Sequence, residues 1–533
     1  MTRRFNVTGL CIPEEDYMVD ISGKIAQIKK LVDNRSYFTI NRARQYGKTT
    51  TLTMLKRELN NEYIVAKISF EGLGDESFES EEAFCLVFLK LMQHALGFSS
   101  AKKYYAKKWF SSNVKTIPAL SKHISKMCKG KKVVLMIDEI DKSSNNRVYI
   151  HFLGILRDKF LSRKDGMDFT FHSVILAGVY DIRNIKLKMI EEGVYTPTTA
   201  ENKLFNSPWN IAVIFDIDMS FNPAEIATML REYENDHRTG MDIQAVSNEL
   251  YDYTSGYPFL VSRICQIIDE DMDREWTAKG VQKAVQALLI EKNTLFDDVF
   301  KNIENSKGLY DFVYNLLVSG NGKVFNVDNP IINVGLRYGF FRDKDGHIAI
   351  ANRIFEIRMI NYYISKEGLH NRKNLNGILQ YDVVKDGVFD MELCLKKFAE
   401  HYAEIFNDSD IEFLERHGRL LFLSYLQPLI NGQGFYHIES QFTDLRRMDI
   451  VVDFGKQQFI IELKIWRGQE YQAEAYEQLC GYLDSKGTGT GWLLTFDFRK
   501  GGNKIRKSST KNFGAGKAEW IEVNGKKIFD VMV

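Results

Sequence analysis

The sequence predicts an α/β chain with one α/β segment near each end and a helical section between them. Three observations support this. Short apolar runs alternate with amphipathic helical patterns through residues 37–215, which is typical of a parallel sheet covered by helices. Helical patterns alone follow over 223–272, and strand patterns return at 435–465 and 490–496. Because single cores stop growing near about 250–300 residues, we expect several domains in this length of chain.

Composition excludes several classes of protein. The chain is 44% hydrophobic and 26% charged with 8 prolines, which excludes a collagen-like or largely disordered chain. The formal net charge is +1, so any binding of nucleic acid must come from local patches. The 6 cysteines are scattered without a CxxC pair, which argues against a zinc or redox motif. We expect reduced thiols in a cytoplasmic protein.

The first twenty residues do not match a secretory signal. Glu14, Glu15 and Asp16 stand where a signal peptide needs an apolar run of about seven or more residues. No apolar stretch of the sequence approaches the roughly 18 residues of a membrane-spanning helix. We therefore expect a cytoplasmic protein with no membrane partner.

The first α/β segment begins with a strand, a polar loop and a helix. Residues 37–40 form the strand pattern, 41–47 the loop, and 48–59 a helix with leucines on one side. This is the order of a phosphate cradle. Further strands are expected at 63–70, 133–137, 173–177 and 210–215, and a helix at 81–96.

The loop carries the groups that a triphosphate needs. Gly47 supplies a tight turn with backbone N–H groups, Lys48 a cation for the terminal phosphates, and Thr49 a hydroxyl for Mg²⁺. Thr50 completes the motif and is counted with the nucleotide-binding residues. A full GxxxxGK[ST] motif has glycine where this chain has Arg42, which we expect to place a guanidinium near the phosphates.

A second motif strengthens this interpretation. Asp138 ends the apolar strand about ninety residues after the loop, where the second Mg²⁺ contact of a nucleotide-hydrolysing site comes from. Glu139 is placed to orient the attacking water as a general base. Asp141 is expected to be a surface or capping residue. GKT alone is a weak signal, but the two motifs together predict ATP binding and hydrolysis.

These motifs resemble the AAA-ATPase-like proteins of bacteria. The resemblance rests on residues 17–20 (YMVD), 38–49 (FTINRARQYGKT) and 135–139 (LMIDE), and covers roughly 5–365. It implies that Pro258, in a segment similar to the GxP element of signal-transducing ATPases, packs near the nucleotide. It implies a winged-helix-like end after residue 336 and a homo-oligomer that completes its sites between subunits. Arg263 is one candidate for the trans-acting arginine, or else a solvated helix residue.

A different constellation lies near the other end of the chain. Phosphodiester hydrolysis needs divalent metal held by carboxylates, together with a cation. Glu462 and Lys464 share one face of a predicted strand, and hairpin pairing can bring Asp449, thirteen residues before Glu462, close to them. The alternative interpretation is an edge strand with a surface glutamate and lysine.

This segment resembles the PD-(D/E)xK nuclease superfamily. The matching text is LRRMDI at 445–450 and IELK at 461–464, with Leu445 and Arg446 departing from the family pattern. The resemblance implies catalytic roles for Asp449, Glu462, Lys464 and Gln478, the last in a QxxxY motif that ends at Tyr482. It implies metal binding by Asp449, Glu462 and Glu439, with Glu415 as the other candidate for the third carboxylate.

Two basic stretches are candidates for contact with phosphates. One gathers Arg446, Arg447 and Arg467 with the segment 499–511, whose alternative interpretation is a solvated tail. The other is the basic and aromatic stretch 102–109, which is also compatible with an ordinary amphipathic helix face.

The sequence therefore predicts four segments and a coupled activity. We expect a P-loop ATPase domain at 1–222, a helical and winged-helix-like domain at 223–365, a linker at 366–388 and a restriction-endonuclease-like domain at 389–533. The predicted function is an ATP-gated, Mg²⁺- or Mn²⁺-dependent DNA nuclease, and this architecture suggests defence against foreign DNA. One alternative is a regulatory nucleotide switch whose C-terminal domain binds nucleic acid or protein without cutting. Another is an ATP-driven motor with the nuclease fold as a clamp.

Overall fold

The computed structural model describes most of the chain, in two compact units. The described residues are 3–97, 103–143, 146–179, 209–306, 308–318, 324–371, 383–385, 387–405, 411–430, 434–439, 449–497 and 517–533. The first unit comprises Met1–Leu288 with Leu336–Gly339, and the second comprises Leu289–Gly335 with Phe340–Val533. The expected division into four segments remains a prediction.

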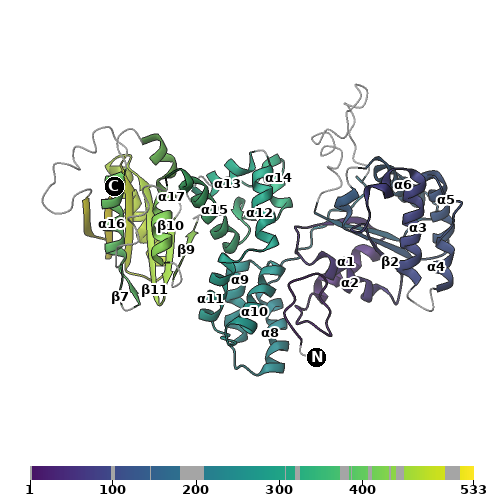
Figure 1. Cartoon of the computed structure of the whole chain (residues 1–533), viewed down its shortest axis with the longest axis horizontal. Helices are drawn as coiled ribbons and strands as arrows, with labels where there is room; N and C mark the ends of the chain where they lie inside the picture. The colour runs from purple at the N-terminus through teal and green to yellow at the C-terminus, as the bar shows by residue number, and fades with distance from the viewer. Residues whose placement is uncertain are drawn as a thin grey trace. The chain divides into compact units, whose positions relative to one another are not determined.

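A parallel four-stranded sheet forms the centre of the first unit (Figure 1). Its strands lie in the order β1-β4-β3-β2, so the last strand in sequence is inserted between the first and the third. The expectation of an α/β fold with a parallel sheet is confirmed. Of the expected strand at 210–215, only Val213 pairs with Phe38, as an isolated bridge. The strands are β1 (Tyr37–Asn41), β2 (Ile64–Ser69), β3 (Val133–Asp138) and β4 (Ser173–Gly178).

The main core of this unit lies between the sheet and helices α3, α5 and α6, which Figure 1 shows grouped on one side of it. Val133, Leu135 and Ile137 of β3 point into this core, whereas the intervening residues of β3 face the opposite side of the sheet. The helices of this part are α1 (Ser22–Asp33), α2 (Lys48–Leu59), α3 (Glu81–Gly97), α4 (Lys103–Trp109), α5 (Ile117–Cys128) and α6 (Arg147–Lys164).

Four helices complete the first unit, as the helical pattern predicts. A capping box starts the first of them: the Asn222 side chain accepts from the Glu225 backbone, and the Glu225 side chain accepts from the Asn222 backbone. The turn before the third depends on Gly256, which has a φ of +72°. These helices are α8 (Pro223–His237), α9 (Ile243–Thr254), α10 (Pro258–Asp271) and α11 (Ala278–Ile290).

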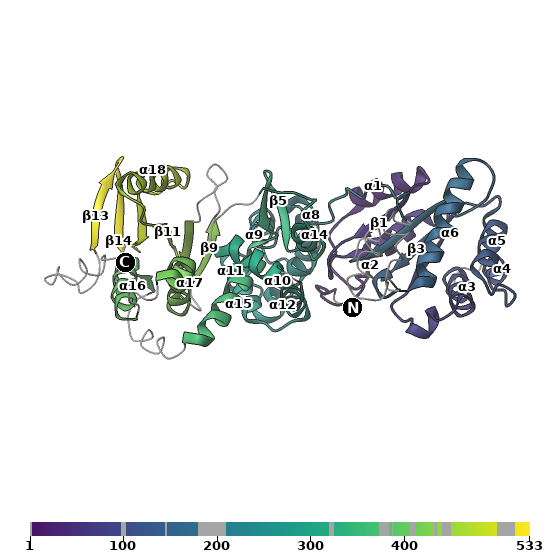
Figure 2. The same cartoon turned by 90° about the horizontal axis from the view of Figure 1, so that it is seen from above.

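The second unit begins with helices and a small hairpin. Strands β5 (Phe341–Lys344; Figure 2) and β6 (His347–Ile350) pair antiparallel. Val324 forms an isolated bridge to His347. The winged-helix identity of this part remains a prediction. The expected linker overlaps the end of α15 and a second small hairpin; its residues 372–382 and 386 lie outside the described ranges. The helices are α12 (Thr294–Asn305), α13 (Leu309–Val318), α14 (Pro330–Arg337) and α15 (Arg353–Asn371), and the second hairpin is β7 (Val384–Lys385) with β8 (Val388–Phe389).

A mixed six-stranded sheet ends the chain, in the order β13-β14-β12-β11-β10-β9. Helix α18 packs on one face of this sheet through Ala475, Leu479 and Leu483. The structure contains the expected strands, and β13 with β14 extends the sheet beyond them. The elements are α16 (Met391–Ile405), α17 (Ile411–Ile430), β9 (Gly434–Glu439), β10 (Asp449–Phe454), β11 (Gln457–Ile465), α18 (Gln469–Ser485), β12 (Thr490–Phe496), β13 (Lys517–Val523) and β14 (Lys526–Met532).

Candidate functional site

The predicted phosphate loop connects β1 to α2 and turns tightly. Gln45 and Gly47 have φ angles of +55° and +74°, and helix α2 begins at Lys48, directly after the second of them. The first N–H groups of α2 have no carbonyl partner within the helix and are available to an anion. The loop therefore has the strand–loop–helix geometry that the sequence predicts.

Lys48 is buried and folded back over its own loop. Its Nζ donates to the carbonyl oxygens of Arg42, at 3.0 Å, and Ala43, at 2.9 Å. Burial lowers the pKa of Lys48, an effect that the nearby carboxylates, led by Glu139, oppose. The ammonium is thus held at the loop by neutral acceptors that phosphate oxygens can replace.

Arg42 has a different role from the expected one. Its guanidinium donates to the carbonyl oxygens of Asn41, at 2.9 Å, and Ile217, at 2.8 Å, and lies 5.5 Å from the centre of the Phe215 ring. These contacts tie the segment 215–217 to the loop. The side chain that replaces the usual glycine is therefore engaged in structural contacts rather than directed to the phosphates.

Thr49 and Asp138 meet where Mg²⁺ is expected. Thr49 Oγ1 donates to Asp138 Oδ2 at 2.8 Å, and Asp138 Oδ1 accepts from the backbone N–H of Glu139 at 3.1 Å. Asp138 is the last residue of β3 and only 3% exposed. A hydroxyl and a carboxylate side by side form the hard oxygen donor set that Mg²⁺ prefers. The residues present therefore fit the ion.

Glu139 stands in a strained backbone position beside this pair. Its φ is +55°, a left-handed conformation that is uncommon for a residue with a side chain. Partial burial raises the pKa of its carboxyl group, and the nearby Lys48 opposes that shift. A carboxylate with a raised pKa is a stronger proton acceptor. Asp141 Oδ2 accepts from the Val179 backbone N–H at 2.6 Å, directly after the end of β4, and its expected surface or capping role remains a prediction.

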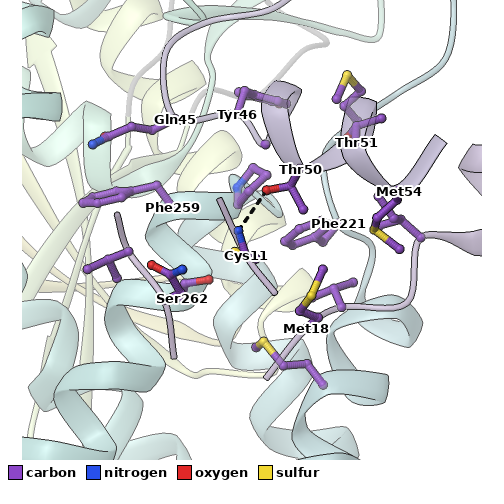
Figure 3. A pocket seen from close by; sticks show the side chains of 18 of the residues that line it. Cys11, Met18, Gln45, Tyr46, Thr50, Thr51, Met54, Phe221, Phe259 and Ser262 are labelled. Atoms are coloured by element: carbon purple, nitrogen blue, oxygen red, sulfur yellow. Dashed lines mark hydrogen bonds between the residues drawn. The ribbon is translucent and has the colours of Figure 1, made fainter. Parts of the chain in front are cut away.

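A cavity of about 330 Å³ opens beside the loop (Figure 3). Thr50 and Pro258, both predicted to contact nucleotide, line it. The N-terminal segment forms another wall: the Cys11 backbone N–H donates to Thr50 Oγ1 at 3.3 Å. Four thioethers and two phenyl rings make much of the lining apolar, as is common in pockets that bind small molecules. These side chains are Met18, Met54, Met219, Met229, Phe221 and Phe259.

The walls of this cavity are fixed by contacts between distant parts of the first unit. Tyr257, just before α10, donates its hydroxyl to the Arg44 carbonyl at 2.6 Å. Its ring lies edge-on to that of Tyr46, at 4.7 Å between centres. A Cβ on Gly256 would lie 1.8 Å from the Phe221 carbonyl oxygen, so this close approach requires glycine.

Sequence reasoning missed the part played by the N-terminal segment. Asp16 is buried and its Oδ2 accepts from the Asn6 side chain, at 3.0 Å, and from the Ile12 backbone, at 2.7 Å. These bonds hold residues 6–12 in the turn that carries the cavity wall. The YMVD motif at residues 17–20 indicated that this part of the chain belongs to the ATPase domain. It did not indicate which residues line the cavity.

In the second unit, strand register aligns the backbone positions of three residues that the sequence predicts to bind metal. Asp449 of β10 stands opposite Glu462 of β11 on one side and opposite Glu439 of β9 on the other. Directly opposed residues of paired strands share a face of the sheet. Glu439, Asp449 and Glu462 therefore occupy one row across three adjacent strands.

Lys464 joins this row to helix α18. Its Nζ lies 2.9 Å from Glu462 Oε1 and donates to Gln478 Oε1 at 3.2 Å. Glu462 is 1% exposed. A buried carboxylate is costly without a cation, and Lys464 supplies that cation here. Carboxylate oxygens are also the ligands that suit Mg²⁺ or Mn²⁺. Of the three aligned residues, only Glu462 has a described side chain. Tyr482, the end of the predicted QxxxY motif, is buried in the core under α18.

A second polar cluster adjoins Lys464 and was missed from the sequence. Tyr476 donates its hydroxyl to Asp530 Oδ2 at 2.6 Å, and the buried Gln472 donates to Thr495 Oγ1 at 3.3 Å. Thr495 stands beside Lys464 in the parallel register of β11 and β12. Gln472 and Tyr476 have the same QxxxY spacing as Gln478 and Tyr482, which was the available signal.

Some candidates cannot be placed with the others. Arg446, Arg447 and the basic segment 499–511 lie outside the described residues, and the side chains of Glu415, Glu439 and Asp449 are also undescribed. Arg467 lies 5.8 Å from the Tyr471 ring centre. Arg263 donates to Gln266 Oε1 at 2.7 Å on its own helix, and its trans-acting role remains a prediction.

Comparison with known proteins gives one family match. Residues 21–313 match the model of the AAA-like domain. No curated protein matches the chain. Within the described residues, every helix is too short or too polar to cross a membrane.

Several solved structures are similar to the chain at low identity. A Walker-type ATPase of Pyrococcus abyssi is 11% identical with a TM-score of 0.45, over 67% of this chain and 99% of that one. The Aeropyrum pernix ORC2 protein is 12% identical with a TM-score of 0.33, over 64% and 94% of the two chains. Cdc6p from Pyrobaculum aerophilum is 13% identical with a TM-score of 0.30, over 65% and 94%.

Proposed function

This chain belongs to the AAA-like domain family and has a nucleotide-binding, ATPase-like function, and from this premise we propose that it hydrolyses ATP and cuts DNA. The ATPase reaction belongs to the first unit and the cleavage to the second. The observation that carries the second half of the proposal is the row of Glu439, Asp449 and Glu462 beside Lys464.

The first unit can bind ATP in two parts. The base enters the apolar cavity, and the phosphates lie at the start of α2, where Lys48 exchanges the carbonyls of Arg42 and Ala43 for phosphate oxygens. Thr49 and Asp138 are the residues that would hold Mg²⁺, which would neutralise charge on the phosphates. Glu139 then orients the attacking water and accepts its proton.

The second unit can act on a phosphodiester. Glu439, Asp449 and Glu462 are the residues that would hold Mg²⁺ or Mn²⁺, which would supply an activated water and charge stabilisation at the leaving group. Lys464 stabilises charge that develops on the phosphate, and Gln478 orients the Lys464 ammonium by its hydrogen bond. Both side chains are fixed on a strand and a helix, which keeps the site preorganised.

We further propose that nucleotide state controls cleavage, in a protein that acts on foreign DNA in the cytoplasm and assembles through its ATPase units. The fusion of the two sites in one chain supports this coupling. The alternative is a nucleotide switch whose second unit binds nucleic acid or a protein without cutting. The two proposals differ in whether any phosphodiester bond is broken.

The decisive experiment measures cleavage of plasmid and single-stranded DNA with Mg²⁺ or Mn²⁺, with and without ATP. We compare the wild type with Lys464→Ala and with Lys456→Ala, an exposed lysine in the turn of the same hairpin. Loss of cleavage of about 100-fold or more in the first variant alone supports the nuclease. Absence of cleavage by the wild type under every condition, with ATP still bound, supports the switch.

A further inference from the structure

A patch of lysines and aromatic rings lies on the first unit, away from the nucleotide site. It is made by helix α4, by the turn before β3 and by the loop before β4. Because all four strands are parallel, the turn and the loop lie at the edge where strands begin, whereas Asp138 lies at the edge where they end. Helix α4 contacts that turn through Tyr105 and Lys131. We call this patch the basic–aromatic face; its main residues are Tyr104, Lys107, Lys108, Lys129, Lys131 and Phe169.

Helix α4 presents one side of this face. Ala106 and Trp109 are buried and attach the helix to the unit, so Lys107 and Lys108 project outward. Tyr104 is 73% exposed, and the Lys108 ammonium lies 4.3 Å from the centre of its ring. This exposed aromatic ring thus stands among cations without being needed for the core.

The three segments form one continuous surface. The Lys131 ammonium lies 5.4 Å from the Tyr105 ring, which joins the turn to α4, and the Lys129 ammonium lies 5.7 Å from the Phe169 ring, which joins it to the loop. Figures 1 and 2 both show α4 beside α5, the helix that leads into this turn. The face is therefore assembled by the fold from residues that are up to 65 positions apart in sequence.

The charge of this face is not balanced locally. Among the described residues, none of its four lysines forms an ion pair with a carboxylate, and the nearby Asp168 is already paired with the buried Lys159 at 2.6 Å. The whole chain has a formal charge of only +1, so this is a local concentration of positive charge. Such a concentration attracts a polyanion.

We propose that the basic–aromatic face binds single-stranded nucleic acid. Lysine ammonium groups match a chain of phosphates, and exposed rings match unstacked bases, which is the combination used by proteins that bind single strands without sequence preference. The proposal goes beyond the nuclease function, because it gives the ATPase unit its own contact with the strand. An anionic membrane is the competing partner, but it matches the cations alone and leaves the ring faces unused.

The test measures binding of fluorescein-labelled oligothymidylate and of the same length of duplex by anisotropy, in EDTA so that no cutting occurs. Lys107→Glu with Lys108→Glu is compared with Lys30→Glu with Lys279→Glu, two exposed lysines elsewhere on the unit that give the same change in charge. We expect the first pair alone to raise the Kd about tenfold or more. The slope of log K against log[salt] should also become shallower by about 1.4, since each of the two lost phosphate contacts contributes about 0.7 to it for a single strand.

A second variant separates stacking from charge. Tyr104→Ala is expected to raise the Kd for the single strand about five- to tenfold, with little change for duplex, whereas Tyr104→Phe retains wild-type affinity. ATP binding by each variant checks that the first unit is folded.

Three results would overturn the proposal. One is an unchanged Kd in the Lys107 and Lys108 variant, and another is an equal loss in the control pair. The third is loss of binding to phosphatidylserine vesicles with no loss of DNA binding. A failure of the nuclease proposal gives a separate result, because binding in EDTA does not depend on cleavage.

Discussion

Glu139→Gln tests the assignment of the general base most directly. Glutamine keeps the size of the side chain and leaves the backbone in its strained conformation, but it cannot accept a proton. General-base catalysis contributes about 10²- to 10⁴-fold, so we expect kcat for ATP to fall by that factor, or by about 2.7–5.5 kcal/mol of barrier. The Kd for ATP should stay within about threefold, because Glu139 is not among the residues that line the cavity.

The pH dependence gives the same variant a second readout. Burial raises the pKa of Glu139, so wild-type kcat should fall as pH decreases through that raised value, at a higher pH than for an exposed glutamate. The residual activity of Glu139→Gln should lack this step. For stability the sign is opposite: a raised native pKa means that the charged form destabilises the fold, so the variant should have an equal or higher Tm at neutral pH.

The assay is phosphate release under saturating ATP, with binding measured separately by a fluorescent ATP analogue. Glu71→Gln is the matched control, since Glu71 is an exposed carboxylate that follows the neighbouring strand β2 at the same edge of the sheet. It should retain kcat within about threefold. Unchanged turnover in Glu139→Gln, with normal ATP binding, would refute the general-base assignment.

Two further substitutions probe the nucleotide site. Gly256→Ala should weaken ATP binding and destabilise the first unit more than Gly240→Ala does. Both glycines have a positive φ, so alanine at either position costs about 1–2 kcal/mol of folding free energy. Only at position 256 does the added Cβ clash with Phe221, which lines the cavity. Denaturant unfolding and analogue binding measure this, and equal effects of the two would contradict it. Thr49→Val deletes the hydroxyl beside Asp138. The Kd for ATP measured without Mg²⁺ should therefore be unchanged, whereas the increase in affinity that Mg²⁺ gives should be lost. Titration of ATP with and without Mg²⁺ measures both.

The parts of each site that follow from local sequence could be predicted. A strand, a glycine turn and a helix start are consecutive, so Gly47 to Thr49 reach their places by local geometry. The hairpin of β10 and β11 is also local, and alternation alone places Glu462 and Lys464 on one face. Asp138 was predicted because it ends a buried parallel strand. The ends of parallel strands lie at one edge of the sheet, which is also the edge where the phosphate loop follows β1.

The rest depends on contacts that no local pattern encodes. Strand β4 lies between β1 and β3. All of these strands are short apolar runs, so their sequences do not indicate which strand pairs with which. The cavity wall formed by the N-terminal segment depends on Asp16, a carboxylate that reads as surface but is buried by its hydrogen bonds. Arg42 was misjudged because a guanidinium near a phosphate loop is expected to bind an anion. Its partners are instead two carbonyl oxygens, one of the adjacent Asn41 and one of the distant Ile217.

The four methionines of the cavity have a consequence for substrate choice. A thioether chain is unbranched and polarisable, so a wall of Met18, Met54, Met219 and Met229 adjusts its shape to whichever flat ring it meets. Apolar pockets discriminate poorly between similar ligands, by roughly 10–200-fold, whereas hydrogen-bonding sites discriminate far more strongly. A cell contains ATP, GTP and their deoxy forms together. Because an adaptable lining of this kind would bind them with similar affinity, the relative concentrations of the purine nucleotides would determine which one occupies the cavity.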